Sequence, residues 1–278
     1  MKTILVPTES HEAIRPALET ALMLARRFDS YIEGFALRFR VNEFVAVDMA
    51  GAIPLESLRD ENFEEARRAR QIFETFMGEQ AVPYADAKAT SLSYGWLDDA
   101  PEGEGVVGSY GRVFDIIVLA RPGDEWQSPS MITLESALFE SGRPVLIAPP
   151  TSPRSLGTNI LVAWNNSTEQ ARTMADAMPF LRLAERITIC TVEGATVAGP
   201  SGEQMARSLK MNGIAAEPIT LKPGKRNAGE TLLAKADELG CDLIVKGAYT
   251  QSRLRQMIFG GTTRHILANA KLPVLMAH

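Results

Sequence analysis

The sequence predicts two α/β domains in tandem, each a parallel β-sheet with helices packed on both faces. Apolar segments of strand length alternate with segments whose apolar residues recur at helical spacing. This order occurs twice, before and after the Pro-rich stretch 149–153, which reads as a linker. A chain of 278 residues is also long enough for two ordinary domains.

Three pairs of matching segments support an internal repeat. Their offsets differ, so the first half holds about 29 more residues (156 − 127) between its first and fourth strands, most of them near 41–59. We therefore place the domains at 1–150 and 157–278. The pairs are Ile4-Leu-Val-Pro with Ile160-Leu-Val-Ala (offset 156), Asp115-Ile-Ile-Val with Asp242-Leu-Ile-Val (127), and Arg143-Pro-Val-Leu-Ile-Ala with Leu272-Pro-Val-Leu-Met-Ala (129).

Hydrophobic periodicity predicts the strands and helices of each half. In the first half, strands are expected at 4–7, 31–37, 87–92, 114–120 and 144–148, and helices at 14–28, 58–77 and 132–139, with a poor helix over 98–111. In the second half, strands are expected at 159–164, 187–192, 215–221, 243–246 and 274–277, and helices at 167–183, 202–211 and 227–239, with one more opened by Gly260-Gly261.

Composition describes a globular protein, with 45% hydrophobic and 23% charged residues. No apolar run approaches the roughly 20 residues that cross a bilayer, and the N-terminus lacks the pattern of a signal peptide. We therefore expect a cytoplasmic protein without a membrane segment. Its two cysteines, Cys190 and Cys241, are then reduced thiols.

The net charge of −5 is shared unevenly between the halves. Residues 1–153 carry 14 Lys and Arg against 24 Asp and Glu, which gives −10. Residues 154–278 carry 15 against 10, which gives +5. The overall acidity argues against nucleic-acid binding, whereas the basic second half suits a small anion.

The segment that follows strand 243–246 has the pattern of an anion cradle. The strand ends at Gly247, and the pair Gly260-Gly261 opens the next helix. Glycines let a backbone approach a ligand closely, and the free N–H groups and positive dipole end of a helix start suit a phosphate. Lys246, Arg253, Arg255 and Arg264 add positive charge nearby, although each of the arginines is equally well explained as a solvated charge on a helix face.

The order of elements, the Ile-Leu-Val start of each repeat and the Pro-Val-Leu ending resemble the universal stress protein family over essentially the whole chain. The resemblance implies two five-stranded domains of the adenine nucleotide alpha hydrolase-like type, binding ATP or another adenine nucleotide with Mg²⁺ as an option. It also implies a glycine signature: Gly, two residues, Gly, nine residues, Gly, then Ser or Thr.

The second repeat keeps part of this signature. Gly247 and Gly260 occupy the first and third glycine positions, Thr250 replaces the second glycine, and Gly261 stands where Ser or Thr is usual. Asn165 takes the family's acidic position, and the neighbouring Trp164 either stacks on a base or fills the core. The site implied in this way comprises Ala163, Trp164, Asn165, Val192, Lys246, Gly247, Thr250, Gly260, Gly261, Thr262 and Thr263.

The first repeat departs further from the signature. After its fourth strand the spaced glycines are absent, Asp124 and Glu125 would repel a phosphate, and Pro122 and Pro129 stiffen the loop. Glu9 matches the family's acidic position, but this single match does not indicate a nucleotide site. We expect this half to have lost nucleotide binding.

Three functions stay open. The leading one is a cytoplasmic stress-response protein that binds an adenine nucleotide in its second half. The others are an interaction protein with two degenerate sites, and a weak ATPase, although no catalytic residue or metal cluster is predicted. The resemblance further implies that the last strands, 145–148 and 274–277, pair within one chain, and that two chains can form a homodimer.

Overall fold

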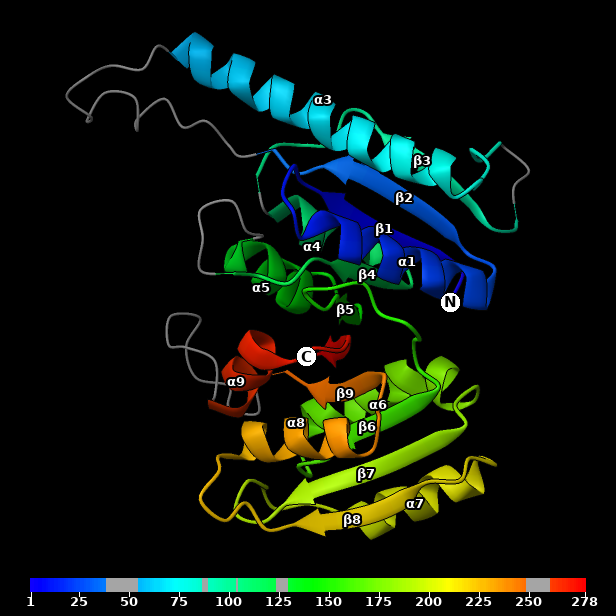
Figure 1. Cartoon of the computed structure of the whole chain (residues 1–278), viewed down its shortest axis with the longest axis vertical. Coiled ribbons are helices and arrows are strands. Elements are labelled where there is room, and N and C mark those ends of the chain that lie inside the picture. The colour runs from blue at the N-terminus through cyan, green and yellow to red at the C-terminus, as the bar shows by residue number, and fades with distance from the viewer. Residues whose placement is uncertain (39–54, 87–89, 104, 124–129, 249–260) are drawn as a thin grey trace, which may run out of the picture.

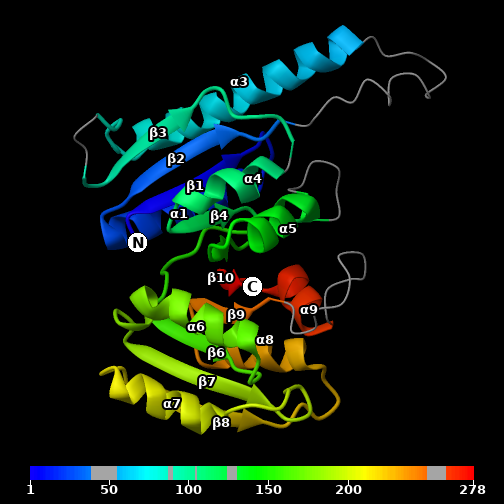
Figure 2. The same cartoon turned by 180° about the vertical axis from the view of Figure 1, so that it is seen from behind.

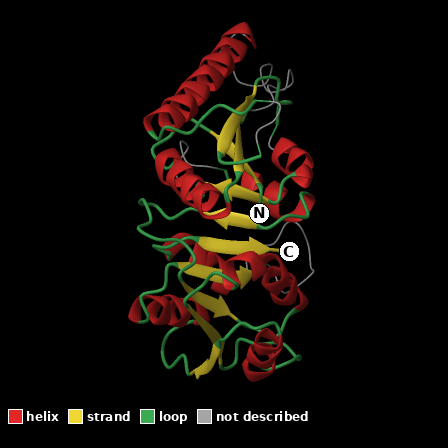
Figure 3. Ribbon diagram, turned by 90° about the vertical axis from the view of Figure 1, so that its right-hand side faces the viewer, coloured by secondary structure: helices red, strands yellow, loops and turns green. Residues whose placement is uncertain are grey.

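The computed structural model describes the chain except residues 39–54, 87–89, 104, 124–129 and 249–260, and the side chains of 55–58. Its strands form one ten-stranded sheet in the order β3-β2-β1-β4-β5-β10-β9-β6-β7-β8. Helices cover both faces of this sheet, and the two halves lie end to end along it (Figures 1 and 3).

Both halves show the alternation of strand and helix that the sequence predicts. The first half contains β1 (Thr3–Thr8), α1 (Ile14–Phe28), β2 (Tyr31–Ala36), α3 (Leu55–Glu79), β3 (Ser93–Leu97), α4 (Gly105–Tyr110), a 3-10 turn (Gly111–Val113), β4 (Ile116–Leu119), α5 (Met131–Glu140) and β5 (Val145–Ile147). The second half contains β6 (Asn159–Ala163), α6 (Thr168–Leu181), β7 (Arg186–Val192), α7 (Gly202–Met211), β8 (Glu217–Leu221), α8 (Ala228–Glu238), β9 (Leu243–Gly247), α9 (Gly261–Asn269) and β10 (Val274–Ala277).

The central strands are buried on both sides, which explains why they read as continuous apolar runs. Successive side chains of a strand point to opposite faces, so each face has its own core. One core lies under α1, α3, α6 and α7, and the other lies under α4, α5, α8 and α9. Each core extends across both halves.

The two halves join through their last strands, as the resemblance implies. β5 pairs with β10 antiparallel, with Leu146 opposite Leu275, whereas the strand pairs within each half are parallel. Side chains strengthen the junction on both faces. Arg27 of α1 donates to the carbonyls of Leu156, Gly157 and Leu183 at 2.8–3.1 Å. The intramolecular pairing is therefore confirmed, and Figure 2 shows β10 beside the first half.

The third strand lies later in the chain than predicted. The sequence favours 87–92, but β3 covers Ser93–Leu97 and pairs with β2, with Gly95 opposite Glu33. A Cβ on Gly95 would lie 2.2 Å from the Tyr31 hydroxyl oxygen, so this glycine makes room for a tyrosine of the neighbouring strand. The Tyr31 side chain therefore lies directly over Gly95.

The connection between β2 and β3 holds the extra length of the first half. It runs over residues 37–92, against 193–216 between β7 and β8. Helix α3 has 25 residues where its counterpart α7 has 10, and it extends past the sheet (Figure 1). The predicted insertion at 41–59 overlaps the start of α3, and most of it lies outside the described residues.

Candidate functional site

Three neighbouring strands of the second half end at one edge of the sheet. β9 ends at Gly247, β6 at Ala163 and β7 at Val192, and the pairing of Val162 with Val245 aligns β6 and β9. β7 follows β6 in the chain and pairs with one side of it, whereas β9 pairs with the other side of β6. The direction in which successive strands are added to the sheet therefore reverses between β6 and β9. In open parallel sheets, ligands bind outside the carboxyl ends of the strands at such a switch point.

Gly247 is required by the packing of helix α6. Its N–H donates to Oε1 of the buried Gln170 at 2.6 Å. A Cβ on Gly247 would lie 2.5 Å from the backbone nitrogen of Gln170, closer than real contacts allow. The sequence predicts that a ligand approaches the backbone at Gly247 closely. In the structure, the first turn of α6 makes this close approach instead.

Lys246 lies buried under the start of helix α9. Its side chain faces the core that α8 and α9 cover, and only 6% of the residue is exposed. The Nζ atom donates to the Gly247 carbonyl at 2.8 Å and to the Thr263 hydroxyl at 2.9 Å. Burial lowers the pKa of Lys246 to about 8, because desolvation disfavours the charged ammonium.

Helix α9 presents its N-terminus to the same edge of the sheet. It begins at Gly261, which is exposed and has no described atom within 4 Å of the place where a Cβ would stand. Thr262 is partly exposed and Thr263 is buried against Lys246. The first N–H groups of a helix have no partners within the helix, so this end can receive an anion. Thr250 and Gly260 of the predicted site lie outside the described residues.

The loops after β6 and β7 are tied together on the other side of the edge. Trp164 is only 3% exposed and its Nε1 donates to the Pro200 carbonyl at 2.8 Å, which favours the core-filling alternative for this ring. The N–H of Val197 donates to the Asn165 carbonyl at 3.1 Å. Asn166, which sequence reasoning did not single out, has a φ of 68° and donates to the Val197 carbonyl at 3.0 Å.

Asn165 caps the turn that enters helix α6. Its Oδ1 accepts from the backbone N–H of Ser167 at 3.3 Å and from the Ser167 hydroxyl at 2.9 Å. Val192 is buried, and its carbonyl accepts from the N–H of Ala195. The structure thus brings Ala163, Asn165, Val192 and Lys246 to the same sheet edge as the start of α9.

Comparison with known proteins identifies the domain that carries this edge. Residues 200–278 match the Universal stress protein family. The C-terminal part of the chain is a universal stress protein domain. The whole chain resembles a universal stress protein from Archaeoglobus fulgidus DSM 4304, with a TM-score of 0.71, 18% identity, and coverage of 99% of this chain and 97% of that one.

A second solved structure supports the same fold. A functionally unknown protein from Pseudomonas aeruginosa PAO1 aligns over 100% of this chain and 92% of its own, with a TM-score of 0.55 and 16% identity. No protein of curated function matches the chain in sequence. The family and the tandem universal stress protein fold expected from the sequence are thereby confirmed.

The cavity between the described residues at the equivalent edge of the first half is small. Leu119 and Ala120 stand where the universal stress protein domain has Lys246 and Gly247. The cavity there, between Glu9, Pro122 and Thr133, measures about 10 Å³, enough for about one water molecule. Asp124, Glu125 and Pro129, which the sequence invokes against phosphate binding, lie outside the described residues.

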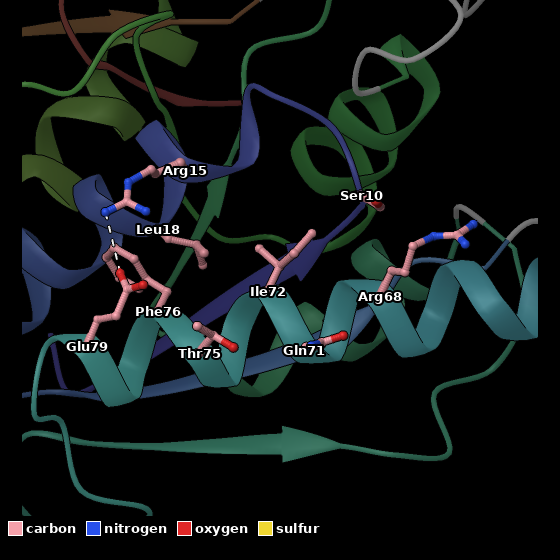
Figure 4. Close-up of a pocket in the computed structure, with 9 residues that line it drawn as sticks. All are labelled: Ser10, Arg15, Leu18, Arg68, Gln71, Ile72, Thr75, Phe76 and Glu79. Carbon is pink, nitrogen blue, oxygen red and sulfur yellow. Dashed lines mark ion pairs between the residues drawn. The ribbon is translucent and has the colours of Figure 1, made fainter.

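A larger cavity of about 370 Å³ lies between α1 and α3, with Ser10 of the loop after β1 at its margin (Figure 4). Leu18, Ile72 and Phe76 supply its apolar wall. Arg15 pairs with Glu19 at 3.2 Å and Glu79 at 3.5 Å, and Arg68 pairs with Glu65. Because both arginines already face carboxylates, this groove has no unmatched positive charge for an anion.

Two further observations bear on function. Among the described residues, no group of three or more His, Cys, Asp and Glu side chains is arranged to hold a metal ion. Within the same part of the chain, no helix combines the length and apolar character needed to cross a membrane.

Proposed function

We propose that this chain is a cytoplasmic universal stress protein whose second half binds ATP or another adenine nucleotide. The observation that carries the proposal is the juxtaposition of Lys246 with the N-terminus of α9 at the topological switch point. A buried ammonium and a helix start both favour negative charge at that edge. Phosphate is the part of a nucleotide that such a site recognises.

The remaining groups at the edge suit the rest of the nucleotide. The N–H groups of Gly261, Thr262 and Thr263 would face the phosphates, with Thr250 and Gly260 supplying the signature positions before them. Asn165 and Val192 lie at the ends of β6 and β7, where ribose and base would follow. Ala163 and the buried Trp164 support this side from the core.

A titration tests the proposal directly. The purified protein, stripped of bound small molecules, is titrated with ATP by isothermal calorimetry up to millimolar concentration. Saturable binding is expected, and folded protein without any binding would refute the proposal. Mass spectrometry of the ligand released from freshly purified, denatured protein would identify the nucleotide carried from the cell.

A second candidate is an interaction protein without a nucleotide. The observation in its favour is the set of hydrogen bonds that ties residues 193–200 to Trp164, Asn165 and Asn166 over the base side of the edge. A Gly260→Trp variant separates the two functions, since it blocks the phosphate end. Stress tolerance unchanged by this variant in cells would favour the interaction protein.

A further inference from the structure

The anion edge of the second half contains a buried cation, Lys246, for which the described part of the chain supplies no carboxylate partner. Lys246 donates to two neutral oxygens, the carbonyl of Gly247 and the hydroxyl of Thr263. An ammonium has three N–H donors, so these acceptors use two of them and neutralise none of the charge. On the opposite face of the sheet, Nε2 of the buried Gln170 in α6 has no hydrogen-bond partner in the described part of the chain.

The neighbouring sequence supplies no negative side chain either. Residues 243–278 contain no Asp or Glu, but they contain three arginines and two lysines. The positive end of the α9 dipole adds charge of the same sign beside Lys246. Buried charges are normally paired, so the missing counter-charge is expected to come from a ligand.

Magnesium does not fit this set of donors. Protein sites for Mg²⁺ with a nucleotide use one or two carboxylates together with phosphate oxygens. Among the described residues at this edge, Asn165 is an amide, and the side chains at the start of α9 are the hydroxyls of Thr262 and Thr263 beside the ammonium of Lys246.

We propose that Lys246 takes the place of the metal ion, so that this edge binds the phosphate chain of a nucleotide without magnesium. The inference rests on the proposed function, because it specifies how that same site neutralises its ligand. The ammonium and the N-terminus of α9 together supply about one and a half positive charges, which favours a phosphorylated nucleotide over an uncharged nucleoside.

The first half shows that the fold accepts an apolar side chain at this position. Leu119 is the counterpart of Lys246 and is buried in the same sheet register. A Lys246→Met variant is therefore expected to fold. Lys271→Met is the matched control, since it removes the same charge from an exposed position two residues after α9.

Calorimetric titration with ATP, in excess MgCl₂ and in excess EDTA, tests the inference. The wild type is expected to bind in both buffers with affinities within about threefold, and Lys246→Met to bind about 10–100-fold more weakly, the range for losing a hydrogen bond to a charged group. Lys271→Met should match the wild type. Lys246→Gln, which keeps a donor without the charge, should lose affinity like Lys246→Met.

The outcomes separate the two proposals. Wild-type binding that disappears in EDTA, or equal affinities of wild type and Lys246→Gln, would overturn the role of Lys246 while leaving the nucleotide site in place. Absence of ATP binding by the wild type in both buffers would overturn the proposed function itself.

Discussion

Replacing Lys246 by methionine should stabilise the protein at neutral pH when no nucleotide is bound. Burial lowers the pKa of Lys246 from 10.5 to about 8. At 1.36 kcal/mol for each pH unit, keeping this side chain charged in the folded state costs about 3 kcal/mol below pH 8. Methionine has a similar length and no charge, so the variant avoids this cost.

The same substitution removes two hydrogen bonds, to Gly247 and Thr263. A typical hydrogen bond contributes about 1 kcal/mol, so their loss offsets about 2 kcal/mol of the gain. We therefore expect Lys246→Met to raise the free energy of unfolding by about 1 kcal/mol at pH 7. The exposed Lys271→Met control should change it by less than about 0.5 kcal/mol.

The dependence on pH gives the sharper test. Between about pH 8 and 10.5 the unfolded chain holds a proton on Lys246 that the folded protein has released. The wild type should therefore gain stability as pH rises through this window, by up to about 3 kcal/mol relative to Lys246→Met, until the order of the two reverses.

Urea denaturation of both proteins at intervals from pH 7 to 10.5 measures this difference. The expected result is a difference in unfolding free energy that favours the variant at pH 7 and the wild type at pH 10.5. A difference that stays constant over the whole range would refute the assignment of Lys246 as an uncompensated buried charge.

Three other substitutions test separate contacts. Gly247→Ala places a Cβ 2.5 Å from the Gln170 nitrogen and should cost about 1–3 kcal/mol of unfolding free energy in urea, whereas Gly78→Ala, with open space on helix α3, should be neutral or stabilising. The Arg121 guanidinium donates to the Ala148 carbonyl within the first half and to the Leu267 and Leu272 carbonyls across the junction. Arg121→Met should lower the free energy of unfolding by about 2 kcal/mol and raise hydrogen exchange at the end of α9. Unchanged exchange there would contradict a role in holding the helix. Gly261→Ser restores the family's hydroxyl at a position where no described atom would meet the new side chain, so the free energy of unfolding should stay the same. ATP affinity should rise a few-fold, because the hydroxyl can donate to a phosphate. A loss of affinity would show that the ligand needs the glycine.

The sequence by itself determined the class of fold and the edge that carries the candidate site. Hydrophobic periodicity is a local property, and the repeated segments at Asp115 and Asp242 made the two halves visible without coordinates. The glycines at 247 and 260–261 pointed to the end of β9, because a parallel strand followed by a helix places its carboxyl end beside a helix start.

Only the tertiary structure decided what surrounds these residues. Whether a glycine serves a ligand or a neighbouring helix depends on distant chain segments, as Gly247 shows against Gln170 and Gly95 against Tyr31. Whether a lysine is a solvated surface charge or a buried one depends on the helix packed over it. The sequence does not show that Lys246 is buried, whereas the packing of α9 makes it a desolvated cation whose described hydrogen-bond partners are neutral oxygens.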